Sequence, residues 1–301
     1  MHRIEIPSSH IIIDFPGEID EMTDKQFVRY VFYVLQYVKG TIDENLFKLN
    51  LTALLLNVRR GFGYFFLKPA KREQREVNLV RISELMESFI EDNLQEGKRE
   101  FKLKSVRNFV PRILNYYGPG RCFENLTYCE YRLARGFFKS FAIDSKEDDL
   151  NRMIAILYRP SKPLWFLRKY FKSCDGERRM TYGSKSNPLL LNRRIAKIAR
   201  VPYHIRYSVL LYFSACEDFL KTGKPVVDGI ELDLSRLYTN DNDSDESKAD
   251  VGMVGLLYSL TETGVFGSIE QTDNSNLWDI MIRLYQVVMQ MQQMEDKYKR
   301  K

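Results

Sequence analysis

The pattern of apolar and polar positions predicts a chain built mainly from helices. Residues 21–58 and 125–159 each contain an aromatic-rich amphipathic helix, an acidic turn and a second, more apolar helix. Residues 77–94 place apolar side chains with the 3.6-residue period of a helix, and residues 188–224 and 276–301 also have helical patterns. We therefore predict a mainly α, multi-helix protein that contains two helical hairpins.

The first helix of each predicted hairpin begins with the same local chemistry. Thr23 is followed three residues later by Gln26, and Thr127 is followed three residues later by Glu130. Each pair fits a capping box, in which the threonine oxygen and the Gln or Glu side chain accept from backbone N–H groups at the helix start. Apolar residues before each cap and aromatic residues four positions after it fit a hydrophobic staple, as in Met22 with Phe27 and Leu126 with Tyr131. Two explanations remain open, a duplicated hairpin and similar local chemistry at unrelated helix starts.

A short β-hairpin is expected ahead of the helices. Residues 3–6 and 11–14 are two extended candidates, and the Pro-Ser-Ser sequence of residues 7–9 separates them as a turn does.

The strongest break inside the chain is the Gly-Pro-Gly sequence of residues 118–120. It predicts an N-terminal region over residues 1–118, with the β-hairpin and helices, and a C-terminal helical region over residues 119–301. In the second region, residues 239–250 form a polar, acidic tract that we expect to be a loop.

Charge is distributed unevenly along a chain whose formal net charge is +6. Residues 159–206 carry thirteen Lys and Arg against two acids, whereas residues 228–250 carry eight acids against two basic residues. Helical spacing places Arg193, Lys197 and Arg200 on one face.

This basic segment has three open interpretations. With nearby aromatic residues, the face could bind phosphates and stack bases of a nucleic acid. The candidate residues for that role are Arg193, Arg194, Lys197 and Arg200. The same face could instead be solvated, or it could meet an acidic partner such as the chain's own acidic tract.

The last predicted helix has a broad apolar, methionine-rich stripe. Methionine side chains adapt to varied apolar surfaces and are common at protein-binding sites. The stripe therefore serves either as core or as a surface that docks onto another protein. Its candidate partner-binding residues are Leu277, Trp278, Met281, Leu284, Val288 and Met291.

No catalytic, metal or cofactor signature is found in the sequence. The three histidines are scattered, and the four cysteines form no CxxC motif and indicate reduced thiols. Asp241, Asp243 and Asp245 resemble the start of a calcium loop, but the glycine and glutamate that such a loop needs are missing. Neither Gly-Phe-Gly nor Gly-Pro-Gly continues into a phosphate loop, and no GxSxG is present. We predict a protein that is not an enzyme and has neither a metal nor a cofactor.

The apolar content of 44% is that of a globular chain and not of a disordered one. No apolar run approaches the roughly 20 residues that cross a bilayer, so no membrane partner is expected. The first residues lack the features of a signal peptide, which favours a cytoplasmic location.

Three stretches of the sequence carry a family resemblance. They are "RIEIPSSHIIIDFPGEIDEMTDKQFVRYVFYVL", "ENLTYCEYRLARGFFKSF" with "DDLNRMIAILYRP", and "LYSLTETGVFGSIEQTDNSNLWDIMIRLYQVV". Together they resemble a loose group of helical proteins from tail-gene regions of bacteriophages and prophages of gut bacteria, often called tail assembly chaperones. The resemblance implies a helical, non-enzymatic protein of the bacterial host cytoplasm that binds another phage protein, such as the tape measure protein or a tail component, before assembly. Simple tail chaperones are shorter than 301 residues. A virion structural role, a nucleic-acid-binding accessory role and an unrelated host protein are therefore the alternatives.

Overall fold

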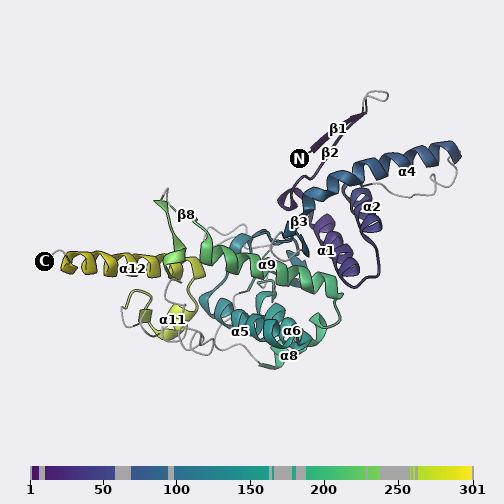
Figure 1. Cartoon of the computed structure of the whole chain (residues 1–301). Helices are drawn as coiled ribbons and strands as arrows, with labels where there is room; N and C mark the ends of the chain where they lie inside the picture. Colours follow the sequence, from purple (N-terminus) through teal and green to yellow (C-terminus); the bar gives the residue numbers. More distant parts are fainter. Residues whose placement is uncertain are drawn as a thin grey trace. The chain divides into compact units, whose positions relative to one another are not determined.

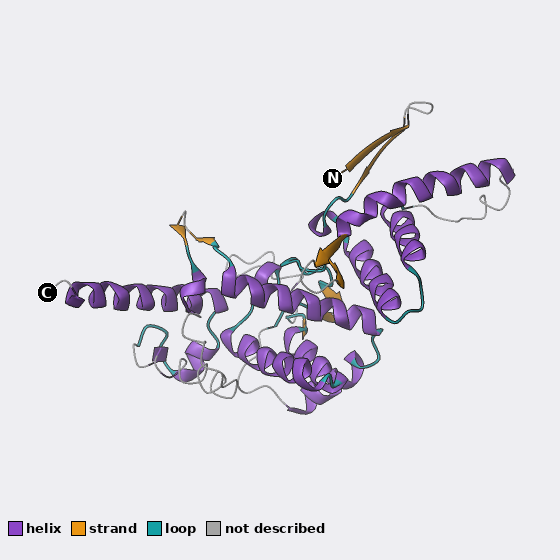
Figure 2. Cartoon of the chain, in the orientation of Figure 1, coloured by secondary structure: helices purple, strands orange, loops and turns teal. Residues whose placement is uncertain are grey.

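The computed structural model confirms the mainly α class (Figures 1 and 2). The residues it describes are 2–6, 11–57, 69–93, 98–162, 165, 178–180, 188–227, 230–237, 258, 260–261 and 264–299. In this part of the chain, strands are short and form only small antiparallel sheets. The acidic tract of residues 239–250 lies outside the described residues.

The chain forms two compact units. Unit 1 comprises residues 1–105 and 202–211, and unit 2 comprises residues 106–201 and 212–301. Helix α9 (Tyr203–Thr222) supplies residues to both units.

Unit 1 is a small helical core joined to two β-hairpins. Its helices are α1 (Asp24–Val38), α2 (Glu44–Leu55) and α4 (Pro69–Ser83), and its short 3-10 helices are η1 (Ile19–Glu21) and η2 (Glu84–Phe89). Its strands are β1 (His2–Ile6) with β2 (Ile11–Phe15) and β3 (Ile90–Asn93) with β4 (Lys98–Phe101). Both strand pairs are antiparallel, and the first pair confirms the predicted N-terminal β element.

The core of unit 1 is largely aromatic. Helices α1 and α2 pack on each other, and Phe27, Tyr30 and Phe47 are fully or almost fully buried between them and η2. Tyr30 also reaches the β3–β4 hairpin, where its hydroxyl oxygen lies 3.1 Å from the Lys102 carbonyl oxygen.

Unit 2 is the larger helical unit. Its helices are α5 (Tyr128–Asp144), α6 (Glu147–Leu157), α8 (Pro188–Ile198), α11 (Ile269–Asp273) and α12 (Leu277–Lys299), with η3 (Arg121–Phe123) and η4 (Leu234–Leu237). A three-stranded sheet has the order β5 (Arg112–Ile113), β6 (Tyr116–Tyr117), β7 (Arg159–Pro160), and β8 (Val226–Val227) pairs with β9 (Ile230–Glu231). Helix α6 packs between α5 and α8 and is buried over most of its length.

Both predicted capping boxes are present. The Thr23 side chain accepts from the Gln26 backbone N–H, and the Thr127 side chain accepts from that of Glu130. Gln26 and Glu130 each accept from the backbone N–H of their threonine in return. A third box starts α11, from Ser268, so this helix start is not confined to the two predicted hairpins.

The boundary between the units differs from the predicted one at residues 118–120. It falls after residue 105, because the segment that follows packs inside unit 2. The Val106 carbonyl accepts from the Cys122 N–H at 2.8 Å, and the Tyr158 hydroxyl donates to the Val110 carbonyl. Gly118 is itself a packing position, since a Cβ atom there would lie 2.7 Å from the Tyr158 ring. The glycines that suggested a linker therefore make room for an aromatic side chain.

Candidate functional site

A fully buried carboxylate at the start of α5 organises one end of unit 2. Glu130 has no exposed surface, and its Oε2 lies 2.9 Å from Arg179 Nη2. Its Oε1 lies 3.9 Å from Arg159 Nε on β7. A charge buried this deeply has to be paired, because removing an unpaired charge from water costs several kcal/mol. These three residues are called the buried ionic cluster below.

Arg179 uses the rest of its guanidinium to bind backbone. Its Nε donates to the Leu157 carbonyl and its Nη1 to the Asn125 carbonyl, both at 3.0 Å. Its backbone forms an antiparallel bridge with Ser161, just after β7. The buried ionic cluster therefore holds residues 178–180 as a short extended segment beside the three-stranded sheet.

The neighbouring arginine, Arg178, is exposed and lies against two aromatic rings. Its guanidinium carbon is 4.2 Å from the centre of the Tyr117 ring and 4.5 Å from that of Trp165. Arg112, also exposed, lies over the same Tyr117 ring at 5.4 Å. Arg112, Tyr117, Trp165 and Arg178 are called the Arg–aromatic surface. The Arg178 guanidinium can bind phosphate beside rings on which planar groups can stack. Arg112 adds positive charge, but its Nε donates to the Leu114 carbonyl at 2.7 Å and its Nη2 to the Asn115 side chain at 3.2 Å.

The basic residues predicted on α8 separate in the structure. Arg193 and Lys197 are exposed on the helix, and Arg200 is exposed just after its end at Ile198. Arg194 does not belong to an exposed phosphate-binding face as predicted, because its side chain is only 7% exposed. Its Nη1 donates to the Ala155 carbonyl at 2.7 Å, so it fastens α8 to α6.

The side chain of Arg194 also lies over Tyr116, 5.5 Å from the ring centre. Adjacent strand residues point to opposite faces, so Tyr116 and Tyr117 on β6 meet different arginines. Tyr117, Arg178 and Arg112 were not predicted as site residues from the sequence. The Tyr116-Tyr117 and Arg178-Arg179 dipeptides can be read in the sequence, but the contact between Tyr117 and Arg178 depends on the fold.

The partner-binding residues predicted on α12 fall into two groups. Leu277 and Met281 are buried in the core of unit 2, which contradicts their assignment to a docking surface. Trp278 is half-buried and donates its indole N–H to the Cys122 carbonyl at 2.9 Å. Leu284 and Val288 are half-buried.

The later part of α12 lies outside the core. Met294 is 60% exposed, and Figure 1 shows the C-terminal half of the helix extending clear of α5, α6 and α8. Met291 belongs to this part of the helix, but its side chain lies outside the described residues.

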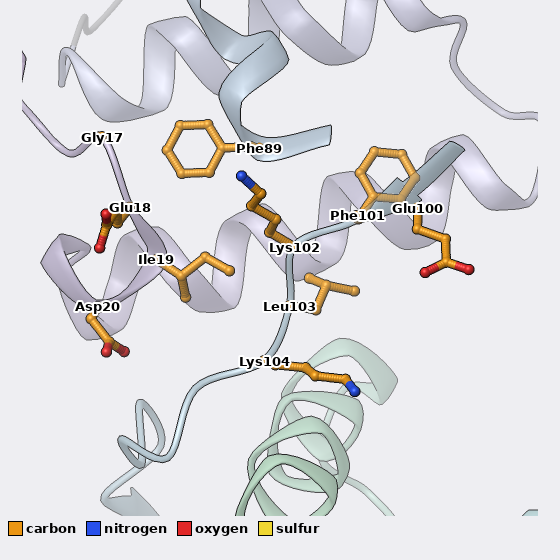
Figure 3. Close-up of a pocket in the computed structure, with 10 residues that line it drawn as sticks. All are labelled: Gly17, Glu18, Ile19, Asp20, Phe89, Glu100, Phe101, Lys102, Leu103 and Lys104. Atoms are coloured by element: carbon orange, nitrogen blue, oxygen red, sulfur yellow. The ribbon is translucent and has the colours of Figure 1, made fainter. Parts of the chain in front are cut away.

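Unit 1 contains a cleft of about 480 Å³ (Figure 3). One wall is the turn after β2, from Gly17 to Asp20, and the other is the segment from Glu100 to Lys104, with Phe89 beside them. Figure 3 shows Ile19 on one wall and Leu103 on the other, with the carboxylates of Glu18, Asp20 and Glu100 and the side chains of Lys102 and Lys104 around them. None of the ten described lining residues is a His, Cys, Ser or Thr, so a hydroxyl or thiol nucleophile paired with a histidine is not found among them.

The thiols of Cys129 and Cys216 are poor nucleophiles in the folded protein. Burial raises the pKa of the Cys129 thiol to about 12, and burial also raises the pKa of the Cys216 thiol. Both groups therefore stay protonated near neutral pH, whereas the thiolate is the reactive form.

Among the described residues, no three His, Cys, Asp or Glu side chains are grouped so that they could hold a metal ion. Within the same part of the chain, no helix combines the length and apolarity that a bilayer crossing needs.

Comparison of the chain with protein-family models, with curated proteins and with solved structures found no match in any of the three.

Proposed function

We propose that this protein acts by binding another protein, and that the C-terminal half of α12 carries the binding surface. The observation behind this proposal is one apolar stripe along α12, with residues at alternating spacings of four and three: Leu277, Met281, Leu284, Val288 and Met291. The stripe starts in the core of unit 2 and continues onto the part of the helix that extends from it.

Such spacing is that of helices that pack side by side along their length. Core packing accounts for the first two residues of the stripe, which are almost fully buried. It does not account for the apolar character that persists as far as Met294, which is mostly exposed. A helix of a partner laid along this half of α12 would bury the stripe, and methionines would adapt to its side chains.

The biological role that we propose is tail assembly in a bacteriophage. The resemblance in sequence to tail assembly chaperones supports it, as does a helical arm suited to a long helical partner such as the tape measure protein. In this role α12 shields apolar segments of the partner in the cytoplasm of the bacterial host until assembly, and basic surfaces increase the rate of encounter. No chemical step is involved.

Co-expression with the proteins encoded beside this gene tests the proposal. We expect one of them to co-purify, to remain bound after nuclease treatment, and to be lost when Val288→Asp and Met294→Asp are introduced. Ile143→Asp is the matched control, because Ile143 is 71% exposed on α5 and lies outside the stripe.

Three results would count against the proposal. They are a gene neighbourhood without tail genes, co-purification that ignores the α12 variants, and retention of the protein in the finished particle. The last result would favour a virion structural role.

The Arg–aromatic surface favours a second function, binding of a single-stranded nucleic acid. Arg178 and Arg112 are exposed cations that lie against Tyr117, and Trp165 extends the aromatic surface. Cations that contact phosphates beside rings that stack bases are the usual means of binding single strands without sequence preference.

A labelled single-stranded oligonucleotide at two salt concentrations tests this second function. We expect affinity to fall with added salt, and to fall at least about tenfold in Tyr117→Ala and in the double variant Arg112→Ala, Arg178→Ala. Arg152→Ala is the control, because Arg152 is an exposed arginine paired with Asp148 in the same unit. Equal losses in the control and the test variants would leave net charge as the explanation and exclude a stacking site.

A further inference from the structure

Helix α4 in unit 1 has a second apolar face whose described residues are exposed. Leu79 and Ile82 are half-buried on the side where α4 packs against α2 and η2. Val77 and Val80 lie on the opposite side of the helix and are 41% and 55% exposed. One turn of helix separates successive members of this outer face, so the two valines are neighbours on its surface.

The outer face ends in charges of opposite sign. Glu73, Val77, Val80 and Arg81 together line a shallow hollow of about 390 Å³. Glu73 lies four residues before Val77, and Arg81 lies four residues after it. The face is therefore apolar at its centre, acidic at its N-terminal end and basic at its C-terminal end.

This arrangement is complementary to itself. If two copies of α4 pack antiparallel with Val77 on the two-fold axis, Glu73 of each copy lies opposite Arg81 of the other. Each ion pair then lies about 6 Å along the helix from the axis, given a rise of about 1.5 Å per residue. Parallel packing would place Glu73 beside Glu73, which is repulsive. Antiparallel packing also sets the two helix dipoles in opposite directions.

We infer that the outer face of α4 is a self-association surface, and that its occupant is α4 of a second copy of this chain. The contact is small and its ion pairs are exposed, so the dimer is weak and depends on concentration. The inference stands on unit 1 alone and does not depend on the partner proposed for α12.

Sedimentation equilibrium of the full chain over a wide concentration range tests the inference, with a charge exchange as the central comparison. We expect the wild type to gain mass with concentration, and Glu73→Arg or Arg81→Glu alone to weaken association because each places like charges opposite each other. The double variant, Glu73→Arg with Arg81→Glu, restores both ion pairs and should recover association. If the single variants weakened association only by disturbing the fold, combining them would not restore it.

Two further variants complete the test. Val80→Asp should weaken the dimer, and Ile143→Asp, the exposed control on α5, should not. A chain that stays monomeric throughout, a double variant no better than the single ones, or a dimer lost in Val288→Asp and kept in the α4 variants would each overturn the inference. Circular dichroism and thermal melting confirm that each variant is folded.

Discussion

Arg178 and Arg179 are neighbours in the chain, yet their side chains lie in opposite environments. Arg179 is almost fully buried against Glu130, whereas Arg178 is exposed against Tyr117 and Trp165. The cause is the extended backbone at this point, which sends successive side chains to opposite sides. One residue therefore stabilises the interior, and the next is available to a ligand.

This contrast predicts very different costs for two matched substitutions. Arg179→Met removes the closest cation from a buried carboxylate, so it should lower the free energy of unfolding by about 3–5 kcal/mol. Arg178→Met, next to it, should cost about 1 kcal/mol or less, because it loses one exposed cation–π contact on each of two rings. Urea denaturation of both variants measures the difference, and similar costs would show that the buried ionic cluster contributes little.

A second residue-scale prediction concerns His204 in unit 1. Burial lowers the pKa of this imidazole, and the positive charge of Arg29 lowers it further. The folded state therefore binds a proton less readily than the unfolded chain, whose histidine pKa is about 6.5. Stability attributed to His204 is present above that pH and is lost as the pH falls through the lower, folded pKa.

NMR titration of the His204 ring protons measures its pKa directly. In Arg29→Met the pKa should rise but remain below about 6.5, because burial is the larger cause and is unchanged. A pKa that does not respond to Arg29→Met would exclude the charge as a cause.

Among the elements, α12 shows that a single helix can serve both the core and the surface. Met281 in its apolar stripe is 4% exposed, and Met294, beside the stripe near the end of the helix, is 60% exposed. Helical periodicity identifies the apolar side of the helix but cannot show where the core ends.

The two methionines allow a matched prediction. Met281→Ala should lower the free energy of unfolding by about 2–5 kcal/mol, because it opens a cavity in a packed core. Met294→Ala should change it by about 0.5 kcal/mol or less and should weaken partner binding instead. Chemical denaturation measures stability, and co-purification with the proposed partner protein measures binding. A large stability cost at Met294 would show that the end of α12 is covered by the chain itself.

At the scale of the whole molecule, the cores of both units depend on buried tyrosines. Burial raises the pKa of Tyr30 in unit 1 and of Tyr158 and Tyr212 in unit 2. The hydroxyl of Tyr158 donates to the Val110 carbonyl, and that of Tyr212 donates to the Gly120 carbonyl. These bonds need the proton that an ionised phenol has lost.

Both units should therefore lose stability in alkali. Above the unfolded tyrosine pKa of about 10, the unfolded chain releases phenolic protons that the folded chain retains, so the free energy of unfolding falls as the pH rises. Denaturation at a series of pH values, with phenolate absorbance as a second signal, measures this. Tyr158→Phe should reduce the slope of stability against pH in this range, and a slope unchanged by that substitution would contradict the prediction.

Local sequence patterns were enough to predict the helical class, the paired N-terminal strands and the places where α1 and α5 begin. These features depend on residues close together in the chain: a threonine cap, a side chain three positions later and an apolar period. Because α11 starts with the same kind of box, a shared box does not distinguish a duplicated hairpin from similar local chemistry.

Which side chains lie inside each unit depends on tertiary packing. Glu130 is fully buried, whereas Gln26, in the equivalent position of the other box, is only half-buried. The fold turned Arg194 inward and left Arg193 exposed, and it brought Arg178 onto Tyr117. Burial and pairing are set by contacts between residues far apart in sequence, so no local pattern specifies them.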